Sequence, residues 1–406
     1  MTSTWTPRRT VYPRIFERPL GITEHGFYWD SRFNGTADVL QHAVVEILGP
    51  TNQTIFDVEN VTRTWQSLKQ QFPLLGSRME ESISGDSVSF VVAEDQLENC
   101  GPGEISFHSV HSMSEAHEFA DDVVNGERLL SNDLLARIVI LSRTDQKSHV
   151  ALTRVLCRKY ILGDIDSKEW EYRKREPMVT GGPLSLRPFL DREWYDKGGA
   201  TNVSLAIGFF FLRLSFMPLG SAANLAPGDD LPSFTDLLSF PRFLLRSRSI
   251  RQQSANLTKH PLFVHISMAR SQASIDRLKD VATSWPAKQG QLAAQIPVTE
   301  QGLVLSHGGS SMGNIDSLLP RNYPIAGASP ILFLVTSGTK LHCRPTELYL
   351  GATTTRQQLH LHVFWDQNVY DDELVKVWLH EVREATEVYL GGDIDTGSLK
   401  KPQIRL

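Results

Sequence analysis

One stretch constrains this 406-residue chain more than any other: Ser148 to Trp170, where an apolar run leads into a short polar turn. Residues 149–157 show apolar alternation and contain β-branched side chains, as a β-strand does. Residues 134–141 predict a second strand beside it. Two adjacent antiparallel strands of this kind deliver Tyr160 and Asp164 into the turn that follows. The turn is therefore the first candidate for a functional site.

Composition indicates a globular protein of one or two domains. Hydrophobic residues make up 41% of the chain and charged residues 21%, and the length can bury two ordinary cores. The net charge of −5 gives no reason to expect nucleic acid or an anionic membrane as a partner. The N-terminus lacks the apolar core of a secretory signal. The most apolar run, residues 203–217, is interrupted by Arg213 and is too short for a membrane span, so we expect no stable membrane insertion.

The cysteines point to a reducing compartment. The chain has three, Cys100, Cys157 and Cys343, and their spacing matches neither a CxxC motif nor a metal-ligand pattern. Free thiols are typical of proteins kept under reducing conditions. We therefore predict a cytoplasmic protein without disulfides.

Helix and strand patterns alternate through the first half. Residues 57–72 place apolar side chains at spacings of three and four, with Asp57 as N-cap. Ser112 and Glu115 have capping-box spacing and open a helix that ends near Asn125. Residues 20–36 are interpreted as an entry segment with a glycine-containing turn. Strands are predicted at residues 37–48, 87–93 and 104–110.

The second half contains fewer clear patterns. Residues 177–199 read as a crossover, residues 203–217 as a buried strand or helix, and residues 218–256 as mostly loop with short helices. A strand is predicted at 262–268 and a helix at 274–282. Further strands are predicted at 331–335, 347–350 and 358–365. A final helix from Asp371 or Asp372 to Leu390 is predicted to bury Leu374, Trp378, Val382, Ala385 and Val388.

The turn sequence Tyr160-Ile-Leu-Gly-Asp164 resembles the HxxxD motif of the two-domain acyltransferase superfamily. This superfamily includes chloramphenicol acetyltransferase, the plant BAHD enzymes, fungal alcohol and trichothecene acetyltransferases, and condensation domains. Residues 307–320, HGGSSMGNIDSLLP, are similar to a segment of the fungal acetyltransferase-like proteins. The resemblance implies an α/β fold of two chloramphenicol acetyltransferase-like subdomains, mixed sheets with flanking helices and a channel between them. We expect these subdomains at residues 1–190 and 191–406, the second shortened, in a monomer.

The motif is degenerate, because Tyr160 stands where the superfamily has its catalytic histidine. The resemblance puts Tyr160 at the reaction centre and makes Asp164 a brace for the turn. An unperturbed tyrosine has a pKa of about 10, and ionising it at pH 7 costs roughly 4 kcal/mol, so Tyr160 suits hydrogen-bond donation better than proton removal. His307 is a further catalytic candidate, the alternative being a polar loop above the channel. The residues assigned to substrate binding are His25, Ser310, Ser311 and Trp365.

Three functions fit these features. The first is an enzyme of fungal secondary metabolism that binds an apolar terpenoid or polyketide intermediate and promotes its cyclisation or pericyclic rearrangement, as a Diels-Alderase does, without acyl transfer. The second is an acyl-CoA-dependent O-acyltransferase acting on a natural-product alcohol, with His307 or His25 as a relocated base. The third is a ligand-binding relative without catalysis. No cofactor or metal is predicted, because His360 and His362 share a strand face without a third ligand.

Overall fold

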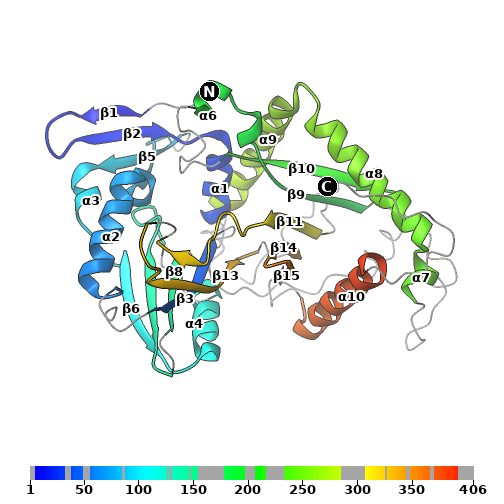
Figure 1. The fold of residues 1–406 in the computed structure, drawn as a ribbon. Helices are drawn as coiled ribbons and strands as arrows, with labels where there is room; N and C mark the ends of the chain where they lie inside the picture. Colours follow the sequence, from blue (N-terminus) through cyan, green and yellow to red (C-terminus); the bar gives the residue numbers. More distant parts are fainter. Residues whose placement is uncertain are drawn as a thin grey trace.

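The protein, a computed structural model, is built from three β-sheets with helices packed against them (Figure 1). The structure describes residues 5–32, 38–48, 55–84, 87–125, 128, 130–145, 148–153, 178–196, 206–215, 233–284, 307–324, 327–343, 348–365 and 370–391. The two larger sheets contain both parallel and antiparallel strand pairs. The predicted α/β class, with mixed sheets and flanking helices, is therefore confirmed.

The largest sheet has six strands in the order β12-β13-β3-β8-β7-β6. Its pairs are antiparallel except β6 with β7, which are parallel because α4 crosses between them. The central strand β3 pairs with β8 on one side and with β13 on the other. The elements are β3 Val39–Ile47, β6 Ile105–Val110, α4 Met113–Asn125, β7 Ile138–Arg143, β8 Ser148–Thr153, β12 Asn322–Tyr323 and β13 Leu332–Leu341.

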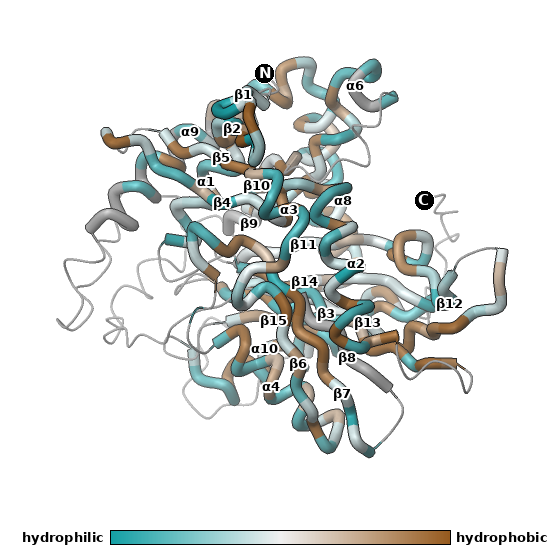
Figure 2. Tube along the Cα trace, turned by 90° about the vertical axis from the view of Figure 1, so that its left-hand side faces the viewer, coloured by the Kyte–Doolittle hydropathy of each residue, from teal (hydrophilic) through white to brown (hydrophobic). Residues whose placement is uncertain are grey.

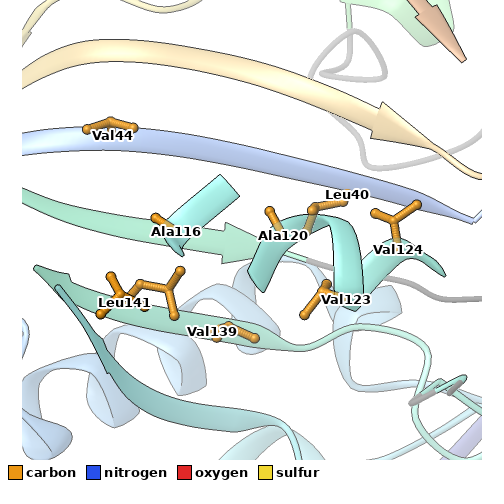
Figure 3. Close-up of a cluster of buried hydrophobic side chains, with 9 residues drawn as sticks. Leu40, Val44, Ala116, Ala120, Val123, Val124, Val139 and Leu141 are labelled. Carbon is orange, nitrogen blue, oxygen red and sulfur yellow. The ribbon is translucent and has the colours of Figure 1, made fainter. Parts of the chain in front are cut away.

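A hydrophobic core lies between this sheet and α4 (Figure 3). Leu40 and Val44 lie on one face of β3, as the two-residue period of a strand requires. α4 contributes Ala116, Ala120, Val123 and Val124, while the neighbouring strands contribute Val110, Val139 and Leu141. Figure 2 shows the apolar stretch of β7 that belongs to this core. Each fully buried valine or leucine contributes about 1.5–3 kcal/mol, so this cluster anchors α4 on the sheet.

The second sheet has five strands in the order β10-β9-β11-β14-β15. Its outer pairs are antiparallel, whereas β11 runs parallel to both neighbours, β9 and β14. Glycine permits the close approach of β9 to β11, since a Cβ built at Gly182 would lie 2.1 Å from the carbonyl oxygen of Gly309. The elements of this sheet and its helices are β9 Met178–Ser185, β10 Ile207–Leu214, α7 Phe234–Leu237, α8 Phe240–Thr258, α9 Phe263–Ser284, β11 His307–Asn314, β14 Tyr349–Thr355, β15 Gln358–Phe364 and α10 Asp372–Leu390.

The third sheet is antiparallel and small, with its strands in the order β1-β2-β5-β4. α2 lies beside it and begins as predicted, since the Asp57 carboxylate accepts a hydrogen bond from the Asn60 amide at 2.8 Å. The elements here are β1 Thr6–Arg9, β2 Ile15–Pro19, α1 Ile22–Arg32, α2 Val58–Gln71, the 3₁₀ turn Pro73–Gly76, β4 Arg78–Glu81, β5 Val88–Ala93 and α3 Glu94–Glu98. A 3₁₀ turn at Arg187–Phe189 and α6 Arg192–Asp196 follow β9.

The predicted entry segment, residues 20–36, contains helix α1, Ile22–Arg32, where a glycine-containing turn is expected from the sequence. Its buried residues Tyr28 and Trp29 pack in a second hydrophobic cluster that includes Ile275 of α9. Gly26 marks the crossing of the two helices, because a Cβ built there would lie 3.7 Å from Cγ1 of Ile275. The glycine that resembles a turn signal in the sequence is therefore a helix-packing residue.

Two long helices, α8 and α9, replace the part of the predicted loop region from residue 240 and the predicted strand at 262–268, and α9 contains the helix predicted at 274–282. The alternating apolar residues at 262–268 favour a strand by pattern, yet the buried side chains are Phe263 and Ser267, four residues apart. Packing of α9 against α1 and β10 overrides the β-propensity of this segment. Within the described ranges, no helix combines the length and apolar character needed to cross a membrane.

The last helix, α10, has its predicted bounds, but its buried face is rotated by about one residue. Leu374 and Val388 are 62% and 37% exposed, whereas Tyr389 is only 8% exposed. The Tyr389 hydroxyl donates to the carbonyl oxygen of Phe234 at 2.8 Å, and its ring stacks on Phe243 with centroids 4.4 Å apart. This tyrosine turns the helix so that its polar tip has a partner while its ring is buried.

Each of the two large sheets contains strands from both sides of residue 190 in the sequence. β9 lies before this position and belongs to the five-stranded sheet, while β12 and β13 come from residues 322–341 and belong to the six-stranded sheet. The division into residues 1–190 and 191–406 stays a prediction, as does the shortening of the second part.

Candidate functional site

Tyr160 and Asp164, the two residues of the predicted motif, lie outside the described residues. The strand that precedes them, β8, lies within the six-stranded sheet and pairs antiparallel with β7, as predicted. On its other side β8 pairs with β3, where His42 lies opposite Leu152. The motif therefore follows an interior strand of the sheet, and the roles of its side chains stay predictions.

The serines of the predicted substrate-binding set lie on one strand, β11, which begins at His307. The register aligns Ser310 with Gly351 of β14, and Gly351 with His362 of β15. Residues directly opposite one another in neighbouring strands project their side chains to the same face of a sheet. Ser310, Gly351 and His362 therefore form one row across three strands.

We call this side of the five-stranded sheet the glycine–histidine face. The other side carries Gly309 and Ser311 and continues across β9 to Gly208 of β10. Helix α9 packs on that side, because a Cβ built at Gly208 would lie 2.4 Å from Oγ of Ser267 in α9. The glycine–histidine face is therefore turned away from α9. It consists of Gly308, Ser310, Tyr349, Gly351, Thr353, His360, His362 and Phe364.

His362 lies close enough to the six-stranded sheet to act on His42 of β3. The pKa of His42 is lowered to about 4, first by burial and then by electrostatic interaction with Lys340, His117 and His362, with a smaller opposing effect of Asp121. These groups come from β13, α4 and β15, so elements of both large sheets surround one imidazole. With this pKa, His42 is neutral at pH 7.

The separation of Ser310 from His362 decides which chemistry the row can perform. One strand lies between them, so the strand spacing of about 4.8 Å puts their backbones roughly 10 Å apart. A nucleophilic serine needs its base within about 3 Å, which rules out a Ser310–His362 nucleophile pair in this arrangement. Gly351 contributes no side chain between them, and a Cβ built there would make only an ordinary 3.5 Å contact with Phe364. The row can thus place a hydroxyl and an imidazole on two sides of a bound ligand.

The two histidines of β15 lie side by side on the glycine–histidine face. Their rings are stacked, with centroids 6.5 Å apart and planes 9° apart. Partial burial lowers the pKa of His362, and the neighbouring His360 lowers it further. Nε2 of His360 is buried and has no hydrogen-bond partner in the described part of the chain. The described residues contain no group of three His, Cys, Asp or Glu side chains that could hold a metal ion.

A crevice next to His42 is too small to be the substrate site. Its volume is about 10 Å³, which holds roughly one water molecule. Nδ1 of His42 is buried without a hydrogen-bond partner among the described residues, and a single water would satisfy it. The crevice is lined by His42, Val44, Met113, Ala116, His117, Ala120 and Lys340.

His25 and Trp365 do not lie on β11. His25 is on α1, with its ring 6.0 Å from that of Trp29, and burial lowers its pKa, followed by the charge of Lys279 on α9. Its Nε2 has no partner in the described ranges. The Trp365 indole nitrogen donates to the Asp372 carboxylate at 3.0 Å and thereby ties β15 to the first turn of α10. The structure brings His307, Ser310 and Ser311 together on one strand and places His25 and Trp365 on other elements.

No pattern in the sequence singles out His42, and the spacing of His360 and His362 favours a cross-strand surface pair over metal ligands. The alternation along residues 358–364 does put both histidines on one strand face. Their alignment with Ser310 depends on the pairing of β11 with β14, which joins segments about forty residues apart. No pattern within a short stretch of sequence specifies the register between β11 and β14.

No family model matches the chain, and no curated protein matches it in sequence. Its fold is similar to that of a trichothecene 15-O-acetyltransferase from Fusarium sporotrichioides, with a TM-score of 0.66, 10% identity, and coverage of 95% of this chain and 98% of the other. It is also similar to the condensation domain of the monacolin K polyketide synthase MokA, with a TM-score of 0.53, 8% identity, and coverage of 92% and 97%. The chain therefore has the acyltransferase and condensation-domain fold, and at these identities the likeness concerns the fold alone.

Proposed function

We propose that this protein is an acyltransferase-fold enzyme that no longer transfers acyl groups. It binds an apolar terpenoid or polyketide intermediate between its two halves and promotes a cyclisation or pericyclic rearrangement. The observation that carries the proposal is Tyr160, which occupies the position of the catalytic histidine in the degenerate motif. Acyl transfer needs a base that accepts a proton near pH 7, and a neutral tyrosine hydroxyl is a donor instead.

Such a rearrangement requires a binding site of complementary shape and one hydrogen-bond donor. The substrate must be held in its reactive conformer, which lowers the entropic part of the barrier. A hydroxyl aimed at a carbonyl oxygen stabilises the charge that develops on that oxygen. The glycine–histidine face supports this proposal, because it combines aromatic walls with neutral polar groups rather than with a nucleophile.

The test is Tyr160→Phe, which keeps the ring and removes the hydroxyl. Because a pericyclic step develops little charge, we expect a rate loss of about tenfold to a hundredfold, at 1.36 kcal/mol per decade. Tyr12→Phe is a matched control, since this exposed tyrosine donates to Glu98 at 3.0 Å on the protein surface. Metabolite profiling of a strain that lacks the gene supplies the substrate as the intermediate that accumulates. Turnover by Tyr160→Phe at the wild-type rate would show that the Tyr160 hydroxyl has no catalytic role and that its ring only lines the channel.

Acyl-CoA-dependent O-acyl transfer is the second candidate, and the imidazoles favour it. His362 is solvent-accessible and stays neutral at pH 7, so it could serve as a relocated base, as could the predicted candidates His307 and His25. Calorimetry with acetyl-CoA, followed by a thiol-release assay with an alcohol acceptor, separates the two functions. Micromolar binding with turnover that falls in His362→Gln or His307→Gln would replace the first proposal, and binding of the intermediate without turnover would indicate a carrier.

A further inference from the structure

The outer side of α8 concentrates positive charge on an acidic protein. The helix contains four arginines and no acidic residue, whereas the whole chain has a net charge of −5. Arg246 is partly buried and donates to the carbonyl oxygen of Ser215 at 3.0 Å. The other three, Arg242, Arg248 and Arg251, are exposed and make no ion pair or hydrogen bond within the described part of the chain. Their charge is therefore available to a partner.

These arginines form a ridge rather than a pocket. Arg242, Leu245, Arg248 and Arg251 follow one another in steps of three, so they form a diagonal row that winds over the exposed half of the helix, each position turned by about 60° from the last. Leu245 lies within the row and is 67% exposed. We call these four residues the arginine ridge. The inward half of α8 is held on β10, where the partly buried Gln253 side chain hydrogen-bonds the backbone of Arg213 at 3.0 and 2.9 Å.

The shape and composition of the ridge select its partner. α8 has 19 residues and is about 28 Å long at 1.5 Å per residue, and it lies along the outer edge of the molecule (Figure 1). A long convex ridge fits an extended negative surface better than it fits a small anion. An exposed leucine among the arginines, Leu245, fits the boundary between lipid headgroups and acyl chains. The exposed ridge positions include no aromatic ring of the kind that stacks on nucleobases.

We propose that the arginine ridge docks this protein on an anionic membrane surface. The docking is peripheral and reversible, and it is independent of the reaction proposed above. Only charges within a Debye length of about 10 Å act on the headgroups, so the local charge of α8 outweighs the net charge of the chain. Leu245 adds an apolar contact that a purely electrostatic partner would not use.

The experiment is flotation of the full chain with vesicles of phosphatidylcholine alone or with about 30% phosphatidylserine. We expect binding only to the anionic vesicles, and release at high salt. Each arginine near such a surface contributes roughly fivefold to partitioning, so Arg242→Gln/Arg248→Gln/Arg251→Gln should lose about a hundredfold. Leu245→Ser should weaken vesicle binding a few-fold and leave any binding to polyglutamate or a short DNA duplex unchanged.

A matched triple variant controls for net charge. Arg192, Lys376 and Arg383 are 93%, 64% and 71% exposed in their side chains, and each is paired with a carboxylate on its own helix. Changing these three to Gln also takes the net charge from −5 to −8, because each substitution removes one positive charge. This variant should bind as the wild type does. Equal binding to neutral vesicles, equal loss in both triple variants, or ridge-dependent binding to DNA or polyglutamate without vesicle binding would each overturn the proposal.

Discussion

Acidification should destabilise this protein through His42, the imidazole that lies where the two large sheets meet. In the folded chain its pKa is about 4, because burial and nearby positive charges disfavour the imidazolium. In the unfolded chain an unperturbed histidine has a pKa of about 6.5. Between these values the unfolded state binds the proton and the folded state does not, so protons favour unfolding.

The sign and size follow from these two pKa values. Above pH 6.5 both states are neutral and His42 carries no penalty. As the pH falls through 6.5 towards 4, stability is lost progressively, by about 1 kcal/mol at pH 5.5 and about 2–3 kcal/mol at pH 4.5. His25, His108 and His362 have pKa values lowered mainly by burial, so they add to the loss in the same direction.

The substitution that isolates His42 is His42→Phe, which keeps a ring and removes the titration. The ring has room because residue 338, directly opposite on β13, is glycine, and a Cβ built there would lie 2.6 Å from Cε1 of His42. The assay is urea unfolding of wild type and variant at pH values from about 7.5 to 4.5. The variant should lose about 2 kcal/mol less than the wild type over that range. Parallel pH dependences in the two proteins would refute the assignment of the effect to His42.

Three further perturbations test the fold by urea unfolding. Lys69→Met should lower the free energy of unfolding by about 3–5 kcal/mol, because Lys69 is fully buried with its ammonium 2.7 Å from the Glu104 carboxylate. Adding Glu104→Gln should recover part of that loss. If it recovers none, packing rather than charge dominates the contribution of Lys69. Gln357→Gly should raise stability by about 1 kcal/mol, since residue 357 has a φ of 63° that glycine adopts without strain, and a loss would show that its side chain compensates. Trp365→Phe should cost about 1 kcal/mol through the lost bond to Asp372, and an unchanged midpoint would argue against that contact.

Local chemistry made much of the first half predictable. The bond from the Asn60 amide to the Asp57 carboxylate and the bond from the Glu115 amide to Ser112 Oγ at 3.1 Å form two of the N-caps that the sequence predicts. The capping box is altered in one detail, because the Glu115 carboxylate accepts from the amide of His111 rather than of Ser112. Caps of this kind depend on residues within four positions, so a sequence pattern can contain them.

Tertiary packing decided what the sequence did not predict. α9 contains the alternating residues of a strand, yet its contacts with α1 and β10 bury Phe263 and Ser267 at helical spacing. The candidate site has the same origin, since Ser310 and His362 share a row only through two strand pairings. The helix α8, which has no fully buried residue, packs against β10 of the five-stranded sheet.

A hairpin turn connects the glycine–histidine face to the sheet that carries the motif strand. β14 and β15 are joined by Arg356 and Gln357, both non-glycine residues with positive φ, a conformation that costs about 1–2 kcal/mol per residue. The Arg356 guanidinium donates to the carbonyl oxygen of Leu334 at 3.1 Å, at the position where β13 departs from regular register with β3.

Asp316 holds the same turn from the other side, by accepting from the Thr355 hydroxyl at 2.8 Å and from the Arg356 amide at 3.1 Å. An irregular β13 therefore provides the acceptors, and a strained turn provides the donor that reaches them. Strain of this kind persists where surrounding contacts over-determine it. Here those contacts fix β15, and with it His362, relative to β13, β3 and β8. The hydrogen bonds of Arg356 thus tie the sheet that carries Ser310, Gly351 and His362 to β13 of the six-stranded sheet, in which β8 is also a strand.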